Sequence, residues 1–174
     1  MIRNVMVKPT LLLITLMGLF GPSLKALETG APAPLVSGID QNGNPIHFAD
    51  IYAKGTTLVF FYPKADTPGC TAQACSLRDS FADLQGKNIQ ILGVSRDSAA
   101  SQKKFQEKYQ LPFPLVADAD GRLAEAFGVG GVMGLPVSKR QSFLIRDGKI
   151  VWMTPSAQTG SHAREVQEAL DTLP

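Results

Sequence analysis

Cys70 and Cys75 are the residues of this 174-residue chain whose type and spacing best suit covalent chemistry, and they are its only cysteines. A structural disulfide between them would close a very small loop, which constrains little of the unfolded chain. A metal site would need more ligands, and the two histidines, His47 and His162, stand at a spacing that matches no common zinc pattern. The cysteine pair is therefore interpreted as redox-active.

The histidines have ordinary structural interpretations. His47 alternates with the apolar residues Ile46 and Phe48, which predicts a position on the surface of a sheet. His162 stands near the start of the last predicted helix, where we expect it to face solvent.

The segment before Cys70 predicts how its thiol is positioned. Thr56–Tyr62 is a nearly continuous run of β-branched and aromatic residues, which predicts a strand buried on both faces. Pro63 ends this strand, and a helix begins at Cys70. Open α/β sheets carry their chemistry beyond the carboxyl ends of their strands. The unpaired N–H groups of a first helical turn also favour the thiolate form of a cysteine, which is the nucleophile.

The residues between strand and helix have physical roles of their own. Thr67 stands three residues before Cys70 and can turn its hydroxyl toward the sulfur or toward a bound oxygen. Pro68 and Gly69 help to set the sharp turn into the helix. Pro63 can shield the pocket from water.

The segment Pro63–Asp79, PKADTPGCTAQACSLRD, closely resembles the peroxiredoxin family, which carries the motif Pro-x-x-x-Thr/Ser-x-x-Cys. The second cysteine, five residues after the first, resembles the peroxiredoxin Q or bacterioferritin comigratory protein group. The resemblance runs from about Gly30 to the end of the chain. It includes LGVSRDS at Leu92–Ser98, LVADADG at Leu115–Gly121 and RQSFLI at Arg140–Ile145.

The resemblance implies a role for each site residue. Cys70 matches the peroxidatic cysteine, and Cys75 matches the cysteine that later bonds to it. Thr67 matches the hydroxyl that orients the peroxide, and Pro63 matches the shielding proline. Arg140 resembles the arginine that completes the pocket from a later strand, where a cation stabilises the thiolate and the leaving oxygen. Four other cations compete for that last role: Lys139, Arg146, Arg96 and Arg78.

The resemblance also implies the reaction of a thiol-dependent peroxidase. The Cys70 thiolate attacks the terminal oxygen of hydrogen peroxide or an organic hydroperoxide, which releases water or an alcohol and leaves a sulfenic acid. Cys75 condenses with that acid to form a disulfide, and an external thioredoxin-like dithiol restores both thiols. No cofactor and no metal is needed, because sulfur supplies both electrons.

The spacing of the two cysteines predicts a conformational change. Residues five apart in an intact helix are displaced by about 7.5 Å along its axis and about 140° around it. A disulfide needs its two Cα atoms within roughly 7 Å and its Cβ atoms facing each other. We therefore expect a continuous helix in the reduced protein and an unwound Cys70–Cys75 turn in the oxidised protein.

The remaining pattern predicts an α/β protein. Predicted strands are Leu35–Ile39, Ile46–Phe48, Ile89–Val94, Ser142–Ile145 and Ile150–Met153; predicted helices are Cys70–Leu84, Ser98–Tyr109, Arg122–Phe127 and His162–Leu170. Gln41–Asn44 is a turn signal consistent with a hairpin, and Asp147-Gly148 is a strong hairpin signal. This order favours a thioredoxin-like fold, in which helices flank a central mixed sheet and a hairpin begins the domain.

Residues 1–26 are predicted to be a secretory signal peptide. Arg3 and Lys8 precede the uncharged apolar run Leu11–Phe20, and small residues follow it. This run is too short for a comfortable membrane span, although an uncleaved N-terminal anchor is the alternative. We expect residues 27–174 to form a single domain that is exported to a periplasm or a thylakoid lumen.

Composition and charge limit the partners. A hydrophobic content of 44% and a charged content of 18% are ordinary for a globular domain. A net charge of +2 without a basic stripe argues against nucleic-acid binding. The resemblance implies a hydroperoxide and a thioredoxin-like dithiol reductant as partners, and a monomer.

Two other functions compete with the peroxidase. A thiol–disulfide oxidoreductase of thioredoxin type would suit an exported domain, but it would use Cys-x-x-Cys, and this chain has four residues between its cysteines. A binding module with a vestigial site would not be expected to keep Pro63, Thr67 and Cys70 together.

Overall fold

The strand that leads to the cysteines, β3 (Thr56–Phe61), is buried inside the sheet. It pairs in parallel with β4 (Ile89–Ser95) and antiparallel with β6 (Ser142–Arg146). Its run of β-branched and aromatic side chains suits this double burial, because both faces of the strand are covered. The predicted buried strand is confirmed.

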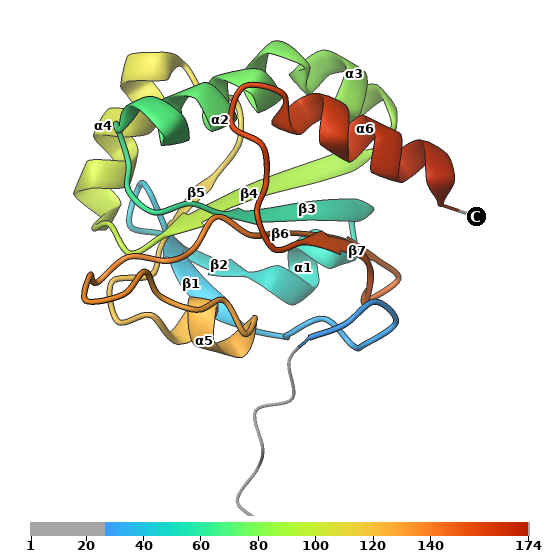
Figure 1. Cartoon of the computed structure of the whole chain (residues 1–174), viewed down its shortest axis with the longest axis horizontal. Helices are drawn as coiled ribbons and strands as arrows, with labels where there is room; N and C mark the ends of the chain where they lie inside the picture. Colours follow the sequence, from blue (N-terminus) through green and yellow to red (C-terminus); the bar gives the residue numbers. More distant parts are fainter. Residues whose placement is uncertain (1–26, 174) are drawn as a thin grey trace, which may run out of the picture.

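The computed structural model describes residues 27–173, and in them the sheet has seven strands in the order β2-β1-β5-β4-β3-β6-β7 (Figure 1). The remaining strands are β1 (Ser37–Asp40), β2 (Pro45–His47), β5 (Leu115–Ala117) and β7 (Lys149–Thr154). β3, β4 and β5 run parallel to one another, and the other neighbours are antiparallel. The predicted mixed sheet with an N-terminal hairpin is confirmed.

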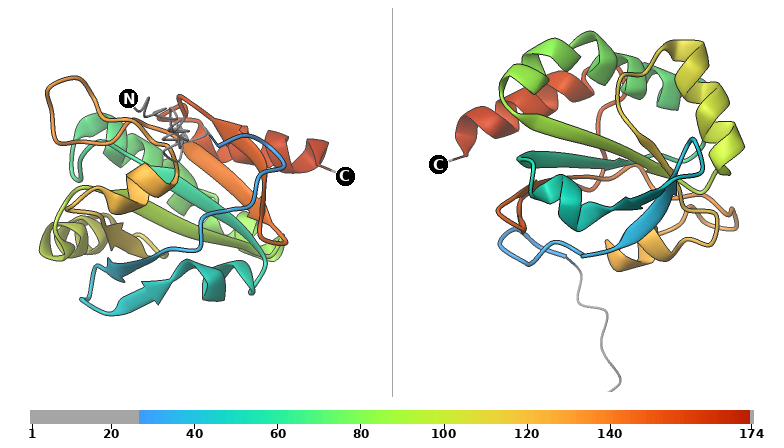
Figure 2. Two further views of the ribbon diagram at one scale, coloured as in Figure 1. Left: turned by 90° about the horizontal axis from the view of Figure 1, so that it is seen from below. Right: turned by 180° about the vertical axis from the view of Figure 1, so that it is seen from behind.

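Helices cover both faces of this sheet (Figures 1 and 2). One face carries α2 (Pro68–Asp79), α3 (Phe81–Gly86), α4 (Ala99–Tyr109) and α6 (His162–Thr172), and the other carries α1 (Phe48–Tyr52) and α5 (Arg122–Ala126). β3 contributes to both cores because its side chains alternate between faces. Leu58 and Phe60 pack in the cluster that includes Cys70, whereas Val59 and Phe61 pack on the opposite side.

Local signals predicted two boundaries well. Asp147 and Gly148 both have positive φ, 51° and 70°, as a two-residue type I′ turn between β6 and β7 requires. Ser98 precedes α4, and its hydroxyl accepts a hydrogen bond from the Ser101 N–H at 3.2 Å.

Three features differ from the prediction. The helix expected over Cys70–Leu84 is divided, because Ser80 has non-helical angles (φ −103°, ψ 11°) and separates α2 from α3. Phe48 begins the short helix α1 instead of ending a strand. β5 was not predicted, since it has only three residues and is defined by its pairing with β1 and β4.

Within residues 27–173, no helix is both long enough and apolar enough to span a membrane. The predicted signal peptide, residues 1–26, lies outside the described residues. Its assignment stays a prediction.

Candidate active site

Cys70 lies in the first turn of α2, and its side chain is buried, with 2% exposed. Thr67 precedes the helix in extended conformation, and its carbonyl accepts a hydrogen bond from the Thr71 N–H at 2.8 Å. Pro68 lies in the first turn of the helix, where a backbone N–H would have no partner within the helix, so the missing N–H of proline costs no hydrogen bond. Cys70 therefore lies in a first helical turn, whose unpaired backbone N–H groups favour negative charge.

Arg140 reaches this sulfur from the segment that precedes β6. Its Nη2 lies 3.4 Å from the Cys70 Sγ and donates a hydrogen bond to it. The arginine precedes β6, and its carbonyl accepts a hydrogen bond from the Ala157 N–H at 3.2 Å. The Gln141 carbonyl next to it accepts one from the Phe61 N–H at 2.7 Å. The backbone of Arg140 is thus held between the end of β3 and the connection that leads to α6.

A glutamine and a histidine complete the surroundings of Arg140. Gln73 is fully buried one turn after Cys70, and its Oε1 accepts a hydrogen bond from Nη1 of Arg140. The Gln73 Nε2 lies 3.1 Å from the Nδ1 of His162. Burial, and then the charge of Arg140, lower the pKa of His162 to about 4. Four side chains therefore form a continuous row: His162, Gln73, Arg140 and Cys70.

The position of His162 corrects the prediction from sequence. The ring is fully buried, not solvent-facing, and stands edge-on to Phe60 with 6.0 Å between ring centroids. His162 begins α6, and this end of α6 packs onto α2, where the Ser76 hydroxyl accepts a hydrogen bond from the Ala163 N–H. His47 lies on the sheet surface as predicted, bonded to Ser37.

The segment that carries Pro63 and Thr67 is held from both sides. The Ala65 N–H donates to the Asp97 carboxylate at 2.8 Å. Asp66 has positive φ, and its carboxylate accepts hydrogen bonds from Lys108 and Tyr109, of which the Lys108 bond does most to lower the pKa of Asp66. Thr67 Oγ1 donates to the Lys64 carbonyl at 2.9 Å and does not cap α2.

Pro63 is half-buried and borders a cleft of about 380 Å³. The other lining residues are Lys64, Arg96, Asp97, Leu135, Pro136 and Val137. The proline thus forms part of the wall of this cleft.

Cys75 lies in the same helix as Cys70 but is only partly buried. Both cysteines are unbridged, and α2 runs without interruption from Pro68 to Asp79. The continuous helix predicted for the reduced protein is confirmed.

The competing cations have other surroundings. Arg78 pairs with Asp79 at 2.7 Å, and Arg146 donates to the Thr56 hydroxyl. Lys139 lies against Gly130, and Arg96 lies against Gly121. Among residues 27–173, the sulfur of Cys70 receives a hydrogen bond from Arg140, the arginine that the sequence resemblance selected.

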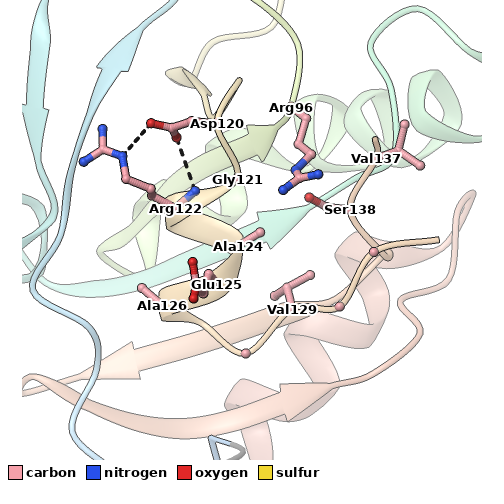
Figure 3. A pocket seen from close by; sticks show the side chains of 13 residues that line it. Arg96, Asp120, Gly121, Arg122, Ala124, Glu125, Ala126, Val129, Val137 and Ser138 are labelled. Atoms are coloured by element: carbon pink, nitrogen blue, oxygen red, sulfur yellow. Dashed lines mark hydrogen bonds and ion pairs between the residues drawn. The ribbon is translucent and has the colours of Figure 1, made fainter. Parts of the chain in front are cut away.

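A larger cavity, of about 850 Å³, adjoins the Pro63 cleft, because Arg96 and Val137 line both (Figure 3). It is bounded by α5 and by residues 128–131 and 137–138, and Arg96 and Ser138 point into it while Arg122 pairs with Asp120. Its lining includes neither Cys70 nor Arg140, so its size does not make it the reaction site.

Comparison with known proteins assigns the family. Residues 29–153 match the model of the AhpC/TSA family. The chain belongs to this family. Peroxiredoxin Bcp of Escherichia coli (strain K12) is 40% identical over 145 residues, which are 80% of this chain and 92% of the relative. The chain is thus a peroxiredoxin, a thiol peroxidase, as the motif at Pro63–Asp79 predicted.

Solved structures agree with this assignment. Peroxidoxin BcpB from Mycobacterium tuberculosis superposes with a TM-score of 0.78 and 32% identity, over 85% of this peroxiredoxin and 99% of that chain. The bacterioferritin comigratory protein of Xanthomonas campestris gives a TM-score of 0.74 and 28% identity, over 83% of this peroxiredoxin and 96% of that chain. The predicted thioredoxin-like fold and the Bcp group are both confirmed.

Two residues of the site were missed in the sequence. Gln73 carries a usable signal, since it stands three residues after Cys70 and therefore on the same helical face. A polar residue beside the apolar positions Ala74 and Leu77 needs a buried partner. His162 carries no comparable signal, because its contact with Gln73 joins residues 89 positions apart.

Proposed function

We propose that this peroxiredoxin reduces hydrogen peroxide and organic hydroperoxides with Cys70 as the attacking thiolate. The observation that carries the proposal is the 3.4 Å contact between Nη2 of Arg140 and the buried sulfur of Cys70. A fixed cation there stabilises the thiolate before attack and the oxygen anion that departs. The X. campestris relative, described as having alkyl peroxide reduction activity, supports the inclusion of organic hydroperoxides.

In the first step, the thiolate attacks the terminal peroxide oxygen and the O–O bond breaks. The sulfur loses two electrons and becomes a sulfenic acid, while the departing hydroxide or alkoxide takes a proton to become water or an alcohol. Thr67 orients the peroxide, because its hydroxyl oxygen can still accept a hydrogen bond while its O–H donates to the Lys64 carbonyl oxygen. Pro63 shields the site from the adjoining cleft.

In the second step, the Cys75 thiol condenses with the sulfenic acid, which forms a disulfide and releases water. The intact helix keeps the two sulfurs on different faces, so the Cys70–Cys75 turn must unwind first. Gln73 lies within that turn, and its bonds to Arg140 and His162 break as it unwinds. An external thioredoxin-like dithiol then reduces the disulfide and becomes a disulfide itself.

The protein acts as an exported monomer in this proposal, in a periplasm or a thylakoid lumen. Support comes from the signal-like composition of residues 1–26. Cytosolic thioredoxin cannot reach such a compartment, so the reductant must be a thioredoxin-like protein that is tethered to the membrane or present in the same compartment. Mass spectrometry of the mature protein, which identifies its N-terminal residue, tests the export. Sedimentation of the purified protein tests the monomeric state.

Anaerobic titration with hydrogen peroxide tests the reaction. One equivalent is expected to convert the reduced protein to a species whose Cys70–Cys75 peptide has lost two hydrogens by mass spectrometry. Cys70→Ser should consume no peroxide while keeping its fold, and Cys75→Ala should consume one equivalent and then stop. Peroxide consumption by Cys70→Ser would overturn the proposal, and a thioredoxin-type oxidoreductase would not consume peroxide at all.

A further inference from the structure

The buried contact between Gln73 and His162 has a defined direction. Arg140 can only donate hydrogen bonds, so the oxygen of the Gln73 amide must face it. The NH₂ of the same amide then faces the Nδ1 of His162 at 3.1 Å. Nδ1 must therefore accept, which makes His162 neutral with its proton on Nε2.

The surroundings of His162 keep it in that form. Its ring is fully buried, and its Nε2 has no hydrogen-bond partner among the described residues. β3 presents Phe60 to the ring and α2 presents Gln73, while the charge that acts on it is that of Arg140 before β6. On its own helix, the nearby carboxylate of Glu165 is bonded to the Gln158 N–H. A proton on Nδ1 would have to be placed beside the NH₂ of Gln73.

We propose that His162 is a positioning residue for peroxide reduction, which acts by holding the Gln73 amide with its oxygen toward Arg140 and so keeps the guanidinium on the Cys70 sulfur. This inference rests on the proposed function. Without an acceptor at the Nδ1 position, the NH₂ of Gln73 loses its buried partner, so the side chain can leave its position and move its oxygen away from the guanidinium. Arg140 would then lose one of the two bonds that hold it over the site.

Two substitutions of similar size, His162→Asn and His162→Leu, distinguish a positioning role from a purely structural one, because the two roles predict opposite orders of activity. Asn places an oxygen near the position of Nδ1, whereas Leu fills about the same volume with no acceptor. If His162 served only packing, Leu would be the better replacement, because it leaves no polar group unpaired in an apolar site. If His162 positions Gln73, Asn is the better replacement for the reaction even where it is worse for stability.

The test is the rate of Cys70 oxidation by hydrogen peroxide in single-turnover stopped-flow experiments. The parent protein is Cys75→Ala, which stops after the first step. We expect His162→Leu to slow the reaction about 10- to 100-fold, somewhat less than the loss of an oxyanion donor, and His162→Asn to stay within about threefold of the parent. Thermal unfolding is expected to rank the two variants in the reverse order.

A double-mutant cycle tests whether the effect passes through Gln73. In a Gln73→Leu background, His162→Leu should change the rate less than about twofold, because the amide that it orients is gone. Equal rates for the Leu and Asn variants, or an undiminished effect of His162→Leu in the Gln73→Leu background, would overturn the inference. Failure of the proposed function looks different, since the Cys75→Ala parent would then show no reaction with peroxide.

Nitrogen NMR of the reduced protein gives a readout independent of activity. The two histidines, His47 and His162, provide two sets of ring signals. We expect the buried ring to show a protonated Nε2 and an unprotonated Nδ1 from pH 7 down to pH 5. A protonated Nδ1 in that range would contradict the assigned hydrogen-bond direction.

Discussion

The two cysteines of α2 each stand near an arginine, yet only one of the two arginines donates to sulfur. Arg140 donates to the Cys70 Sγ at 3.4 Å. Arg78 stands close enough to Cys75 for their charges to interact, but its guanidinium is bonded to Asp79 at 2.7 Å and to the Tyr109 carbonyl at 2.9 Å. The hydrogen bond that Arg78 donates to the Asp79 carboxylate is also the main cause that raises the pKa of Arg78.

The difference between these regions shows that a nearby cation is not sufficient. Nη2 of Arg140 can donate to the sulfur because Nη1 donates to the neutral amide of Gln73 and so fixes the guanidinium. Cys70 is buried, so the charge of Arg140 acts on it with little screening by water, whereas Cys75 is partly exposed. This difference supports the proposed roles, in which Cys70 attacks the peroxide and Cys75 acts in the step that requires unwinding of the helix.

The largest expected effect comes from removing each arginine in turn. Arg140→Met should slow oxidation of Cys70 by hydrogen peroxide about 10²- to 10³-fold, the usual cost of losing a donor to developing charge. Arg78→Met is the matched control, and its rate should stay within about threefold of wild type, because the guanidinium makes no bond to either sulfur. Stopped-flow measurements give the rate constant of Cys70 oxidation for each variant. Comparable losses of rate in the two variants would contradict the distinction between the two arginines.

A second effect concerns stability and pH in the buried region. The folded-state pKa of His162, about 4, lies below its ordinary value of 6.5, so between these values the unfolded chain binds a proton that the folded protein does not. The contribution of His162 to the free energy of unfolding is therefore fully present above pH 6.5. It is lost as the pH falls toward 4, and the loss is on the order of 3 kcal/mol.

Urea unfolding at pH 7 and pH 4 measures this loss. His162→Leu should lose less stability than wild type over the same interval, by about that amount, because the other titrating groups are unchanged in the variant. Identical losses in both proteins would show that His162 is protonated in the folded state.

The third effect is a difference in amide exchange between α2, which holds both cysteines, and α4 on the same face of the sheet. Formation of the Cys70–Cys75 disulfide should unwind the intervening turn, so its backbone N–H groups should exchange at least about tenfold faster in the oxidised protein. The N–H groups of α4, Ala99–Tyr109, serve as the control and should exchange alike in both states. Equal protection of the turn in both redox states would contradict the unwinding.

The sequence predicted best what depends on neighbours along the chain. The apolar run of β3 and the Asp147-Gly148 turn are local, and both were correct. β5 could not be predicted, because its three residues follow a proline segment and become a strand only by pairing with β1 and β4. The break at Ser80 was also missed, since helical spacing of apolar residues continues across it.

The site divides in the same way. Pro63, Thr67 and Cys70 are close in sequence, and the motif alone indicated their chemistry. Arg140 could be chosen among five cations only through the family resemblance, because the contact with Cys70 spans 70 positions. His162 was wrongly expected to face solvent, since α6 is amphipathic and only its packing on α2 places this ring inside.

The smallest effect tests how closely Arg140 must approach the helix. A Cβ at Gly69 would stand 3.3 Å from Nη2 of Arg140, so Gly69→Ala must displace the guanidinium by a few tenths of an ångström. The resulting misalignment should slow the reaction with peroxide about 3- to 10-fold, since catalytic hydrogen bonds are sensitive to small displacements. Gly86→Ala, also at a helical position, is the control, because a Cβ there meets no atom within 4 Å and its rate should equal that of wild type. Because alanine favours both helices, a slower Gly69→Ala with undiminished thermal stability would assign the loss to the arginine, whereas equal rates for both variants would mean that the guanidinium tolerates displacement.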